Sequence, residues 1–323
     1  MLIEYTLSFI LAGATATICS LTSGGIIWNI VNTSFFPGLL LILAIMIILA
    51  GHRKAFLRVL DGPKKFRNYG LKDLKDMELS LSFAFKSLLY ICLFYLLISS
   101  IYFYLNFENT QTLGFNLAAV MYAVFNFAFF GLIMITIKGK LKAKIIAFMA
   151  EPEPSEKKPQ RLTGKEIFLQ VSKILICIAL IAGVYLFIIY HDIRNESLSE
   201  PLSIYYMRDI PGLVYIFIPT FLLLTISGNF KNFFAALKIS IRNEKISVTK
   251  KAISVNAVET LRLLFLLEGI MSAVCGYIGM LFYLEDRSML GINFAVASVP
   301  LIYGLLFNLV MLPVESKLSR LAD

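Results

Sequence analysis

The chain has 323 residues, of which 58% are hydrophobic and 16% are charged, and its formal net charge at pH 7 is +9. A soluble domain usually carries about 25% charged residues, so this composition argues against a soluble globular protein. The basic excess would suit a nucleic-acid-binding protein, but the basic residues cluster between long uncharged stretches. That distribution predicts membrane topology instead.

The uncharged stretches predict membrane-spanning helices. A helix needs roughly 20 apolar residues to cross a bilayer, and backbone groups inside lipid must find their hydrogen bonds within their own segment. The first uncharged stretch, residues 5–51, is long enough for two spans with a turn-forming segment between them. We expect eight spans, near 4–22, 36–51, 85–106, 112–137, 167–190, 210–228, 261–284 and 288–312.

Features of soluble enzymes and secreted proteins are missing from the sequence. Segment 2–22 is interpreted as a retained first span and not as a signal peptide, because Glu4 is its only early charge. No nucleotide-binding, zinc-protease or hydrolase motif occurs, and the two histidines form no cluster, so we expect no enzyme, no cofactor and no metal. We interpret the four cysteines as inert buried thiols, since each falls in an uncharged stretch: Cys19, Cys92, Cys177 and Cys275.

Basic residues are distributed unevenly between the loops, which predicts the orientation of the chain. Segments 52–86, 138–165 and 231–262, with Lys173 and the residues after Pro313, carry 27 of the 30 Lys and Arg residues. The alternate loops carry the other three, together with seven acidic residues. Because loops rich in Lys and Arg stay in the cytoplasm, we expect both termini there.

The chain also contains an internal repeat. The matched pieces are PGL at 37–39 and 211–213, GHRKAFLRVL at 51–60 and GNFKNFFAAL at 228–237, and LGFN at 113–116 and LGIN at 290–293. The last two pairs share an offset of 177 residues. Each half contains four predicted spans, and an even number gives both halves the same orientation, so the repeat is predicted to be parallel.

The repeat defines the expected domain organisation. We expect a first four-helix repeat at 1–149, a cytoplasmic linker at 150–165 and a second four-helix repeat at 166–323. Three prolines and mixed charges favour a solvated linker. The basic stretch 138–149 allows two interpretations, a helix along the lipid headgroups or an extension of the fourth span.

Residues 268–318 carry a pattern more specific than hydropathy. The final predicted span and its end contain recurring small residues, a Tyr-Gly pair, an asparagine, a proline and a Lys-Leu pair, at Gly291, Ala295, Val296, Ala297, Tyr303, Gly304, Asn308, Pro313, Lys317 and Leu318. Asp209, Ile210 and Pro211 precede the second span of the same half. These residues resemble the MotA/TolQ/ExbB family of ion-driven stator proteins. The resemblance covers most of 166–320, and 1–140 only through the internal repeat.

The resemblance implies an all-α polytopic protein of the bacterial inner membrane, with two MotA-like repeats that are surrounded by membrane lipid. It implies a homo-oligomeric ring around a single-span partner similar to MotB, TolR or ExbD, which carries the ion-binding aspartate and couples ion flow to mechanical work or transport. Where family members carry hydroxyl residues, this chain has Ala273 and Pro300. Two alternatives therefore stay open: a stand-alone secondary transporter with parallel repeats, and a non-conducting scaffold derived from stator proteins.

Candidate functional residues concentrate in the last two predicted spans. Glu268 is the one carboxylate well inside a span, where acids usually serve a function, although a structural pairing with Arg262 or with Lys side chains near the cytoplasmic interface is the alternative interpretation. The ion-pathway or pore-lining candidates are Glu268, Ser272, Asn293, Ser298 and Pro300. The helix-packing candidates, most of them small enough to let a neighbouring helix approach closely, are Gly269, Gly276, Gly279, Tyr303 and Gly304. The predicted hinge or turn residues are Pro37, Pro211 and Pro313.

Overall fold

The computed structural model describes residues 3–22, 35–60, 69–105, 113–149, 210–242, 247–282 and 290–320. Within these ranges every regular element is an α-helix, and no strand occurs. The predicted span at 167–190, the predicted linker at 150–165 and the single tryptophan, Trp28, lie outside the described residues.

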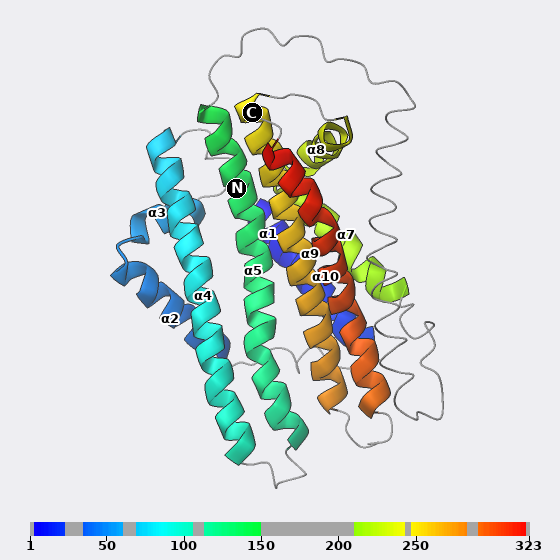
Figure 1. Ribbon diagram of the computed structural model, residues 1–323. Helices are drawn as coiled ribbons and strands as arrows, with labels where there is room; N and C mark the ends of the chain where they lie inside the picture. Colours follow the sequence, from blue (N-terminus) through cyan, green and yellow to red (C-terminus); the bar gives the residue numbers. More distant parts are fainter. Residues whose placement is uncertain are drawn as a thin grey trace.

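Four long helices form a row at the centre of the molecule (Figure 1). They are α4 (Leu71–Leu105), α5 (Leu113–Met149), α9 (Val248–Phe282) and α10 (Leu290–Arg320). α4 packs against α5, α5 against α9, and α9 against α10. α4 and α9 run in one direction and α5 and α10 in the other, so neighbours in the row are antiparallel (Figure 1). The contact between α5 and α9 therefore joins the first half of the chain to the second.

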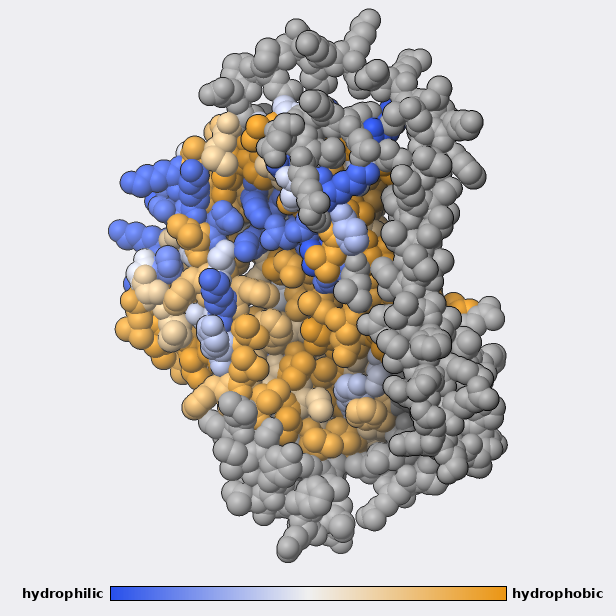
Figure 2. Space-filling model, viewed as in Figure 1, coloured by the Kyte–Doolittle hydropathy of each residue, from blue (hydrophilic) through white to orange (hydrophobic). Residues whose placement is uncertain are grey.

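Each of these four helices contains a segment long and apolar enough to cross a membrane. The apolar segments are Leu71–Leu96, Val120–Met149, Val248–Leu281 and Val296–Ser319. Hydrophilic residues gather towards the end of the molecule where α8 lies, and hydrophobic residues cover most of the described surface below them (Figure 2). We call this end the basic end, because most Lys and Arg residues of the described helices lie near it. The prediction of an all-α membrane protein is confirmed by the length and composition of the helices.

A short amphipathic helix follows an apolar helix in each half. In the first half α2 (Phe35–Leu49) leads into α3 (Arg53–Leu60), and both pack on α4. In the second half α7 (Ile210–Ile226) leads into α8 (Phe230–Arg242) at an angle of 103°, and both pack on α9. If this bent pair is one span, the described residues contain five candidate spans. The remaining helix, α1 (Ile3–Thr22), contacts α5, α7 and α9 and so touches both halves.

α2 and α7 end in the same way, at a glycine with a left-handed backbone. The φ angle is 73° at Gly51 and 74° at Gly228, a conformation that costs other L-residues about 1–2 kcal/mol. After each glycine, the next amide donates to the carbonyl five residues before it, at 3.0 Å after Gly51 and 3.2 Å after Gly228. This is the Schellman motif. It ends both helices at the same point and turns the chain into α3 and α8.

The two halves share helix boundaries and burial at an offset of 177 residues. The matched helix starts are Arg53 and Phe230, Leu71 and Val248, and Leu113 and Leu290. On α2 the side chains of Leu39 and Leu43 are buried, and so are Ile216 and Thr220 at the matched places of α7. Corresponding helices therefore turn the same face towards the core.

The helices extend beyond the predicted spans at the basic end. α4 begins at residue 71 and α9 at residue 248, well before the predicted starts at 85 and 261. Hydropathy detects only the part of a helix that suits lipid, so it misses charged turns that continue into water. α5 runs on to Met149. The basic stretch 138–149 therefore extends the fourth predicted span and does not form a separate helix along the headgroups.

The three prolines predicted as hinges or turns lie within helices. Pro37 and Pro211 lie in the first turns of α2 and α7, where the missing amide of proline costs no helical hydrogen bond. Pro313 lies inside α10, which continues to Arg320. α10 therefore continues past the predicted end of the last span at residue 312, and the chain stays helical through Pro313.

Candidate functional site

Glu268 is a fully buried carboxylate in the interior of α9. It lies within Val248–Leu281, one of the segments that are long and apolar enough to span a membrane. Neither of its side-chain oxygens has a hydrogen-bond partner among the described residues. A carboxylate in an apolar interior is among the most costly groups that a helix can bury, and it is usually retained for a function.

The neighbours of Glu268 along the helix show which side of α9 it occupies. Leu267 meets α5, because its side chain lies against Gly131. Gly269 meets α10, because it lies against Gly304. Successive residues of an α-helix are about 100° apart around its axis, so Glu268 projects between these two contacts. α1, α7 and α8 also pack on α9.

Small and polar side chains line the packed faces of these helices. Ser272, one turn after Glu268, is buried and has a polar partner. On α7, Thr220 is fully buried, and its hydroxyl has no hydrogen-bond partner among the described residues. On α1 the buried residues within 6–18 are all small, namely Ser8, Ala12, Thr15 and Ala16. These hydroxyl groups lie on packed faces that also carry bulky rings, since Phe217 of α7 packs against Phe265 of α9.

This arrangement can accept a proton or a small cation, but it carries no acid–base pair. An ionised carboxylate is tolerated at such depth only when a positive charge or several hydrogen bonds compensate the lost hydration. No such partner lies within hydrogen-bond or ion-pair distance of Glu268 in the described part of the chain. The group is therefore suited to exchanging a proton or binding a cation that comes from elsewhere.

Arg262 does not pair with Glu268, and the alternative interpretation of a structural ion pair is wrong. The guanidinium of Arg262 forms an ion pair with Glu315 of α10 and donates two hydrogen bonds to the side-chain oxygen of Asn308, at 3.0 and 3.2 Å. The Asn308 amide in turn donates to the Arg262 backbone carbonyl at 3.2 Å. This network fastens α9 to α10 near the basic end and leaves Glu268 without a counter-charge from Arg262.

α9 and α10 lie very close together at two glycines, Gly269 and Gly304. A Cβ atom on Gly304 would lie 2.6 Å from the carbonyl oxygen of Phe265 and 3.1 Å from the Cα of Gly269. A Cβ on Gly269 would lie 3.1 Å from the carbonyl oxygen of Pro300. These distances leave no room for a side chain, so the two backbones are in direct contact. Small residues at such places allow the dense van der Waals packing that holds membrane helices together.

The other predicted residues are distributed around this contact. Ser298 shares a hydrogen bond of 2.7 Å with Tyr277 and does not bond to Glu268. Tyr303 is partly buried against the core, and Gly276 and Gly279 are buried on α9. Asn293 lies on α10, but its side chain is outside the described residues. Of the other predicted ion-pathway residues, Ser272 lies one turn after Glu268 on α9, and the Pro300 carbonyl of α10 lies against Gly269.

A second buried polar cluster, which the sequence did not indicate, surrounds Gly139 of α5. Asn256 donates to the Gly139 carbonyl at 3.0 Å. A Cβ on Gly139 would lie 2.7 Å from the Thr260 hydroxyl oxygen and 3.0 Å from the Asn229 amide nitrogen. The carboxamide of Asn229 is fully buried and has no hydrogen-bond partner among the described residues. The spacing of Asn256 and Thr260, one turn apart, is the only sequence signal for this cluster.

This cluster lies where α5 of the first half packs against α9 of the second half. Next to it, Lys142 of α5 forms an ion pair of 2.6 Å with Glu259 of α9. No group of three or more His, Cys, Asp or Glu residues within the described ranges is placed to hold a metal ion.

No protein-family model, curated protein or solved structure matches the chain.

Proposed function

We propose that this chain is a stator-type membrane protein that resembles the MotA/TolQ/ExbB family in tandem-duplicated form. Several copies form a ring of helices around a single-span partner similar to MotB, TolR or ExbD. The ring couples ion flow to mechanical work or transport, and the partner supplies the ion-binding aspartate. The proposal includes eight spans in two parallel repeats, with both termini on the cytoplasmic side of a bacterial inner membrane.

The repeat supports this proposal at the level of the backbone. Corresponding helices begin 177 residues apart, and α2 and α7 end in the same Schellman motif at Gly51 and Gly228. α4 and α9 run in the same direction, as two units in parallel orientation require (Figure 1). Each half then supplies one antiparallel hairpin of long helices, α4–α5 and α9–α10, to the central row.

The observation that carries the proposal is the contact between α5 and α9. On α5 it involves the line of residues through Gly131, Gly139 and Lys142, which meet α9 directly. On α9 it involves Leu267 and Thr260. In the repeat, α10 corresponds to α5 and α4 corresponds to α9. Each copy therefore carries one side of the same contact at each end of its row, α4 at one end and α10 at the other.

The end helices expose the faces that the middle helices bury. Met271 of α9 is fully buried, whereas its counterpart on α4, Phe94, is 68% exposed. Ala128 of α5 is fully buried, whereas its counterpart on α10, Leu305, is 45% exposed. α10 of one copy can therefore pack against α4 of the next copy as α5 packs against α9. Such a head-to-tail contact produces a ring when its rotation closes.

Disulfide cross-linking between copies tests this assembly. The contact of Gly131 with Leu267, in antiparallel helices, places Ala128 opposite Met271, so we expect Leu305 of one copy to lie opposite Phe94 of the next. A double Leu305→Cys/Phe94→Cys variant, made after replacing the four native cysteines, should form a ladder of cross-linked oligomers when membranes are oxidised. Each single variant should remain largely monomeric on a denaturing gel.

A variant that moves one cysteine to an unrelated exposed position is the matched control. Leu49 lies on α2 and is exposed, but it does not correspond to any residue of the α5–α9 contact. A Leu305→Cys/Leu49→Cys variant should give no ladder. If this control forms the same ladder, or if the Leu305→Cys/Phe94→Cys variant forms none, the proposed contact between copies is refuted.

The orientation is tested independently by labelling. A single cysteine at Ser155, in the predicted cytoplasmic linker, should be inaccessible to a membrane-impermeant thiol reagent in intact cells and should react after the membrane is opened. Labelling in intact cells would reverse the proposed orientation.

A stand-alone secondary transporter is the second candidate, and Glu268 favours it. A buried carboxyl in the chain itself could carry protons without an aspartate from a partner. Purified chain in liposomes with an internal pH-sensitive dye should show no proton uptake if the stator proposal is correct. Uptake that is abolished by Glu268→Gln would support the transporter and refute the dependence on a partner.

A further inference from the structure

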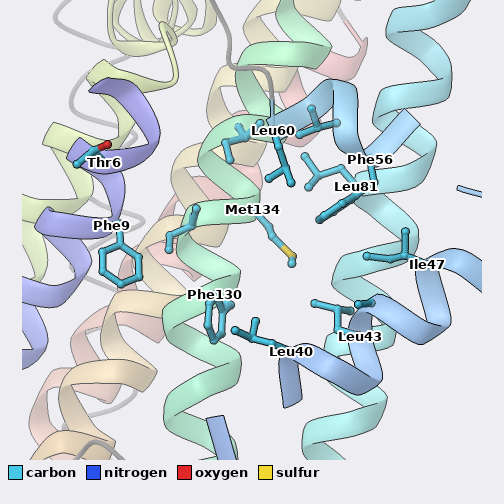
Figure 3. Close-up of a pocket in the computed structure, with 14 residues that line it drawn as sticks. Thr6, Phe9, Leu40, Leu43, Ile47, Phe56, Leu60, Leu81, Phe130 and Met134 are labelled. Atoms are coloured by element: carbon cyan, nitrogen blue, oxygen red, sulfur yellow. The ribbon is translucent and has the colours of Figure 1, made fainter. Parts of the chain in front are cut away.

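The first half contains an apolar cavity. It lies between α1, α2, α3, α4 and α5, and its volume is about 550 Å³, within the range of roughly 300–1,000 Å³ that is common for ligand sites. Met134 of α5 and Leu43 and Ile47 of α2 face the same open space (Figure 3). Phe56 and Leu60 of α3 lie at the edge of this space nearest the basic end (Figure 3).

The lining is almost entirely hydrocarbon. Thirteen of the fourteen lining residues are apolar, and the remaining one is Thr6. An apolar cavity stays dry, because water inside it would have too few hydrogen-bond partners. The cavity is open on one side, since Leu40, Phe9 and Leu60 of its lining are partly exposed, and without an occupant its walls lose van der Waals contacts. A flexible hydrocarbon is the occupant that removes both costs.

The second half shows what fills the equivalent space there. Counted back from the glycine that ends each helix, Phe217 and Phe221 of α7 occupy the places of Leu40 and Ala44 of α2. The ring of Phe217 packs edge-on against phenylalanine rings of α9 and α10, with centroid distances of 5.2 and 4.4 Å. Smaller residues at these two places leave the first half with a cavity where the second half has an aromatic cluster.

One of the helices that line the cavity, α3, carries positive charge. α3 places Phe56, Val59 and Leu60 on the lining, and Arg53 lies one turn before Phe56. Arg53 and Lys54 are exposed, and neither forms an ion pair with another described residue. An amphipathic helix with basic residues beside a buried apolar face is typical of contact with anionic lipid at the membrane surface.

We propose that this cavity holds an acyl chain of one anionic phospholipid, whose phosphate lies against Arg53 and Lys54. The lipid replaces, in the first half, the side-chain volume that Phe217 and Phe221 supply in the second. It thereby anchors α2 and α3 to the central row. The site depends on the location of the chain in a membrane and not on its function as a stator, so the two proposals stand or fall separately.

Native mass spectrometry of the full chain tests the proposal. The protein is purified in detergent, stripped of loosely bound lipid and exposed to mixed micelles that contain phosphatidylglycerol or phosphatidylcholine. The wild type should retain a single phosphatidylglycerol molecule after this treatment. Ala44→Phe, which copies the second half, should lose it, because the new ring fills the cavity. Arg53→Gln/Lys54→Gln should retain a lipid but lower the preference for phosphatidylglycerol by about tenfold.

Ile45→Phe is the matched control, since Ile45 is the exposed neighbour of Ala44 and does not line the cavity. It should retain the lipid as the wild type does. Thermal unfolding gives a second readout: phosphatidylglycerol should raise the melting temperature of the wild type and of Ile45→Phe, but not of Ala44→Phe. If Ala44→Phe fails to fold, Leu40→Phe replaces it in both measurements.

Three results would overturn the proposal. One is retention of the lipid by the cavity-filling variant. Another is equal loss of the lipid by the Ile45→Phe control. The third is a wild-type protein that binds no phosphatidylglycerol and gains no thermal stability from it.

Discussion

The close contact between the backbones of α9 and α10 leads to a direct prediction about the stability of the protein. Gly304 of α10 lies against Gly269 and the carbonyl of Phe265 on α9, and a Cβ atom there would lie only 2.6 Å from that carbonyl oxygen. Both obstacles are backbone atoms, so no side chain can rotate away. We predict that Gly304→Ala separates α9 from α10 and destabilises the protein, although alanine is the smallest possible side chain.

The magnitude follows from two opposing effects. To restore an ordinary contact of about 3.4 Å, α10 must move by roughly 0.8 Å, and overpacking of this kind typically costs about 1–3 kcal/mol. Replacing glycine by alanine inside a helix contributes about 1 kcal/mol in the opposite direction. Gly13→Ala on α1 isolates the second effect, because a Cβ at Gly13 has nothing within 4 Å. The two variants should therefore differ in unfolding free energy by about 1–3 kcal/mol, with Gly304→Ala the less stable.

Unfolding of the purified chain in mixed micelles, with increasing SDS and a helix-sensitive signal such as circular dichroism, measures this difference. The comparison between the two alanine variants cancels helix propensity and most effects of the detergent. If Gly304→Ala is as stable as Gly13→Ala or more stable, the close approach of α9 and α10 does not exist in the folded protein, and the reasoning is refuted.

Three further predictions concern individual residues. Gly51→Ala and Gly228→Ala should each lower the unfolding free energy by about 1–2 kcal/mol, since both positions have positive φ. Similar losses of stability in SDS titrations would support equivalent helix caps. No loss at either position would contradict the Schellman geometry. Glu315→Gln should destabilise the chain by about 1–3 kcal/mol because it leaves Arg262 partly buried without its counter-charge, and the double variant with Arg262→Gln should recover part of that loss in the same titration. Glu268→Met should raise the stability by about 1–3 kcal/mol, because it removes two buried oxygens without partners; a loss of stability would show that Glu268 has a partner.

The position of Glu268 could be predicted from the sequence, but its surroundings could not. Its position inside a span followed from the absence of other charges around it, and the structure places it within a candidate span. Its surroundings could not be derived in the same way. Arg262 seemed a suitable partner because it lies six residues away, but an α-helix turns by about 100° per residue, and Arg262 faces α10, where Glu315 neutralises it.

The long helices show the same division between local and non-local information. Hydropathy located the apolar segments of α4, α5, α9 and α10, but it missed the charged turns by which α4 and α9 extend at the basic end. The resemblance drew attention to Gly304 and Asn308 as positions of a pattern. Only the structure shows Gly304 in contact with the backbone of α9 and Asn308 in a network with Arg262.

The sequence by itself determined that this chain is a helical membrane protein, because the cost of placing charges and open backbone groups in lipid acts on each stretch of about 20 residues separately. The tertiary structure decided which helices are neighbours. Lys142 and Glu259, which form an ion pair, are 117 residues apart in the chain, and the cavity beneath α3 exists because five helices leave a space that Ala44 is too small to fill. Such features depend on how side chains from distant segments fit together, and no local pattern of residues encodes that fit.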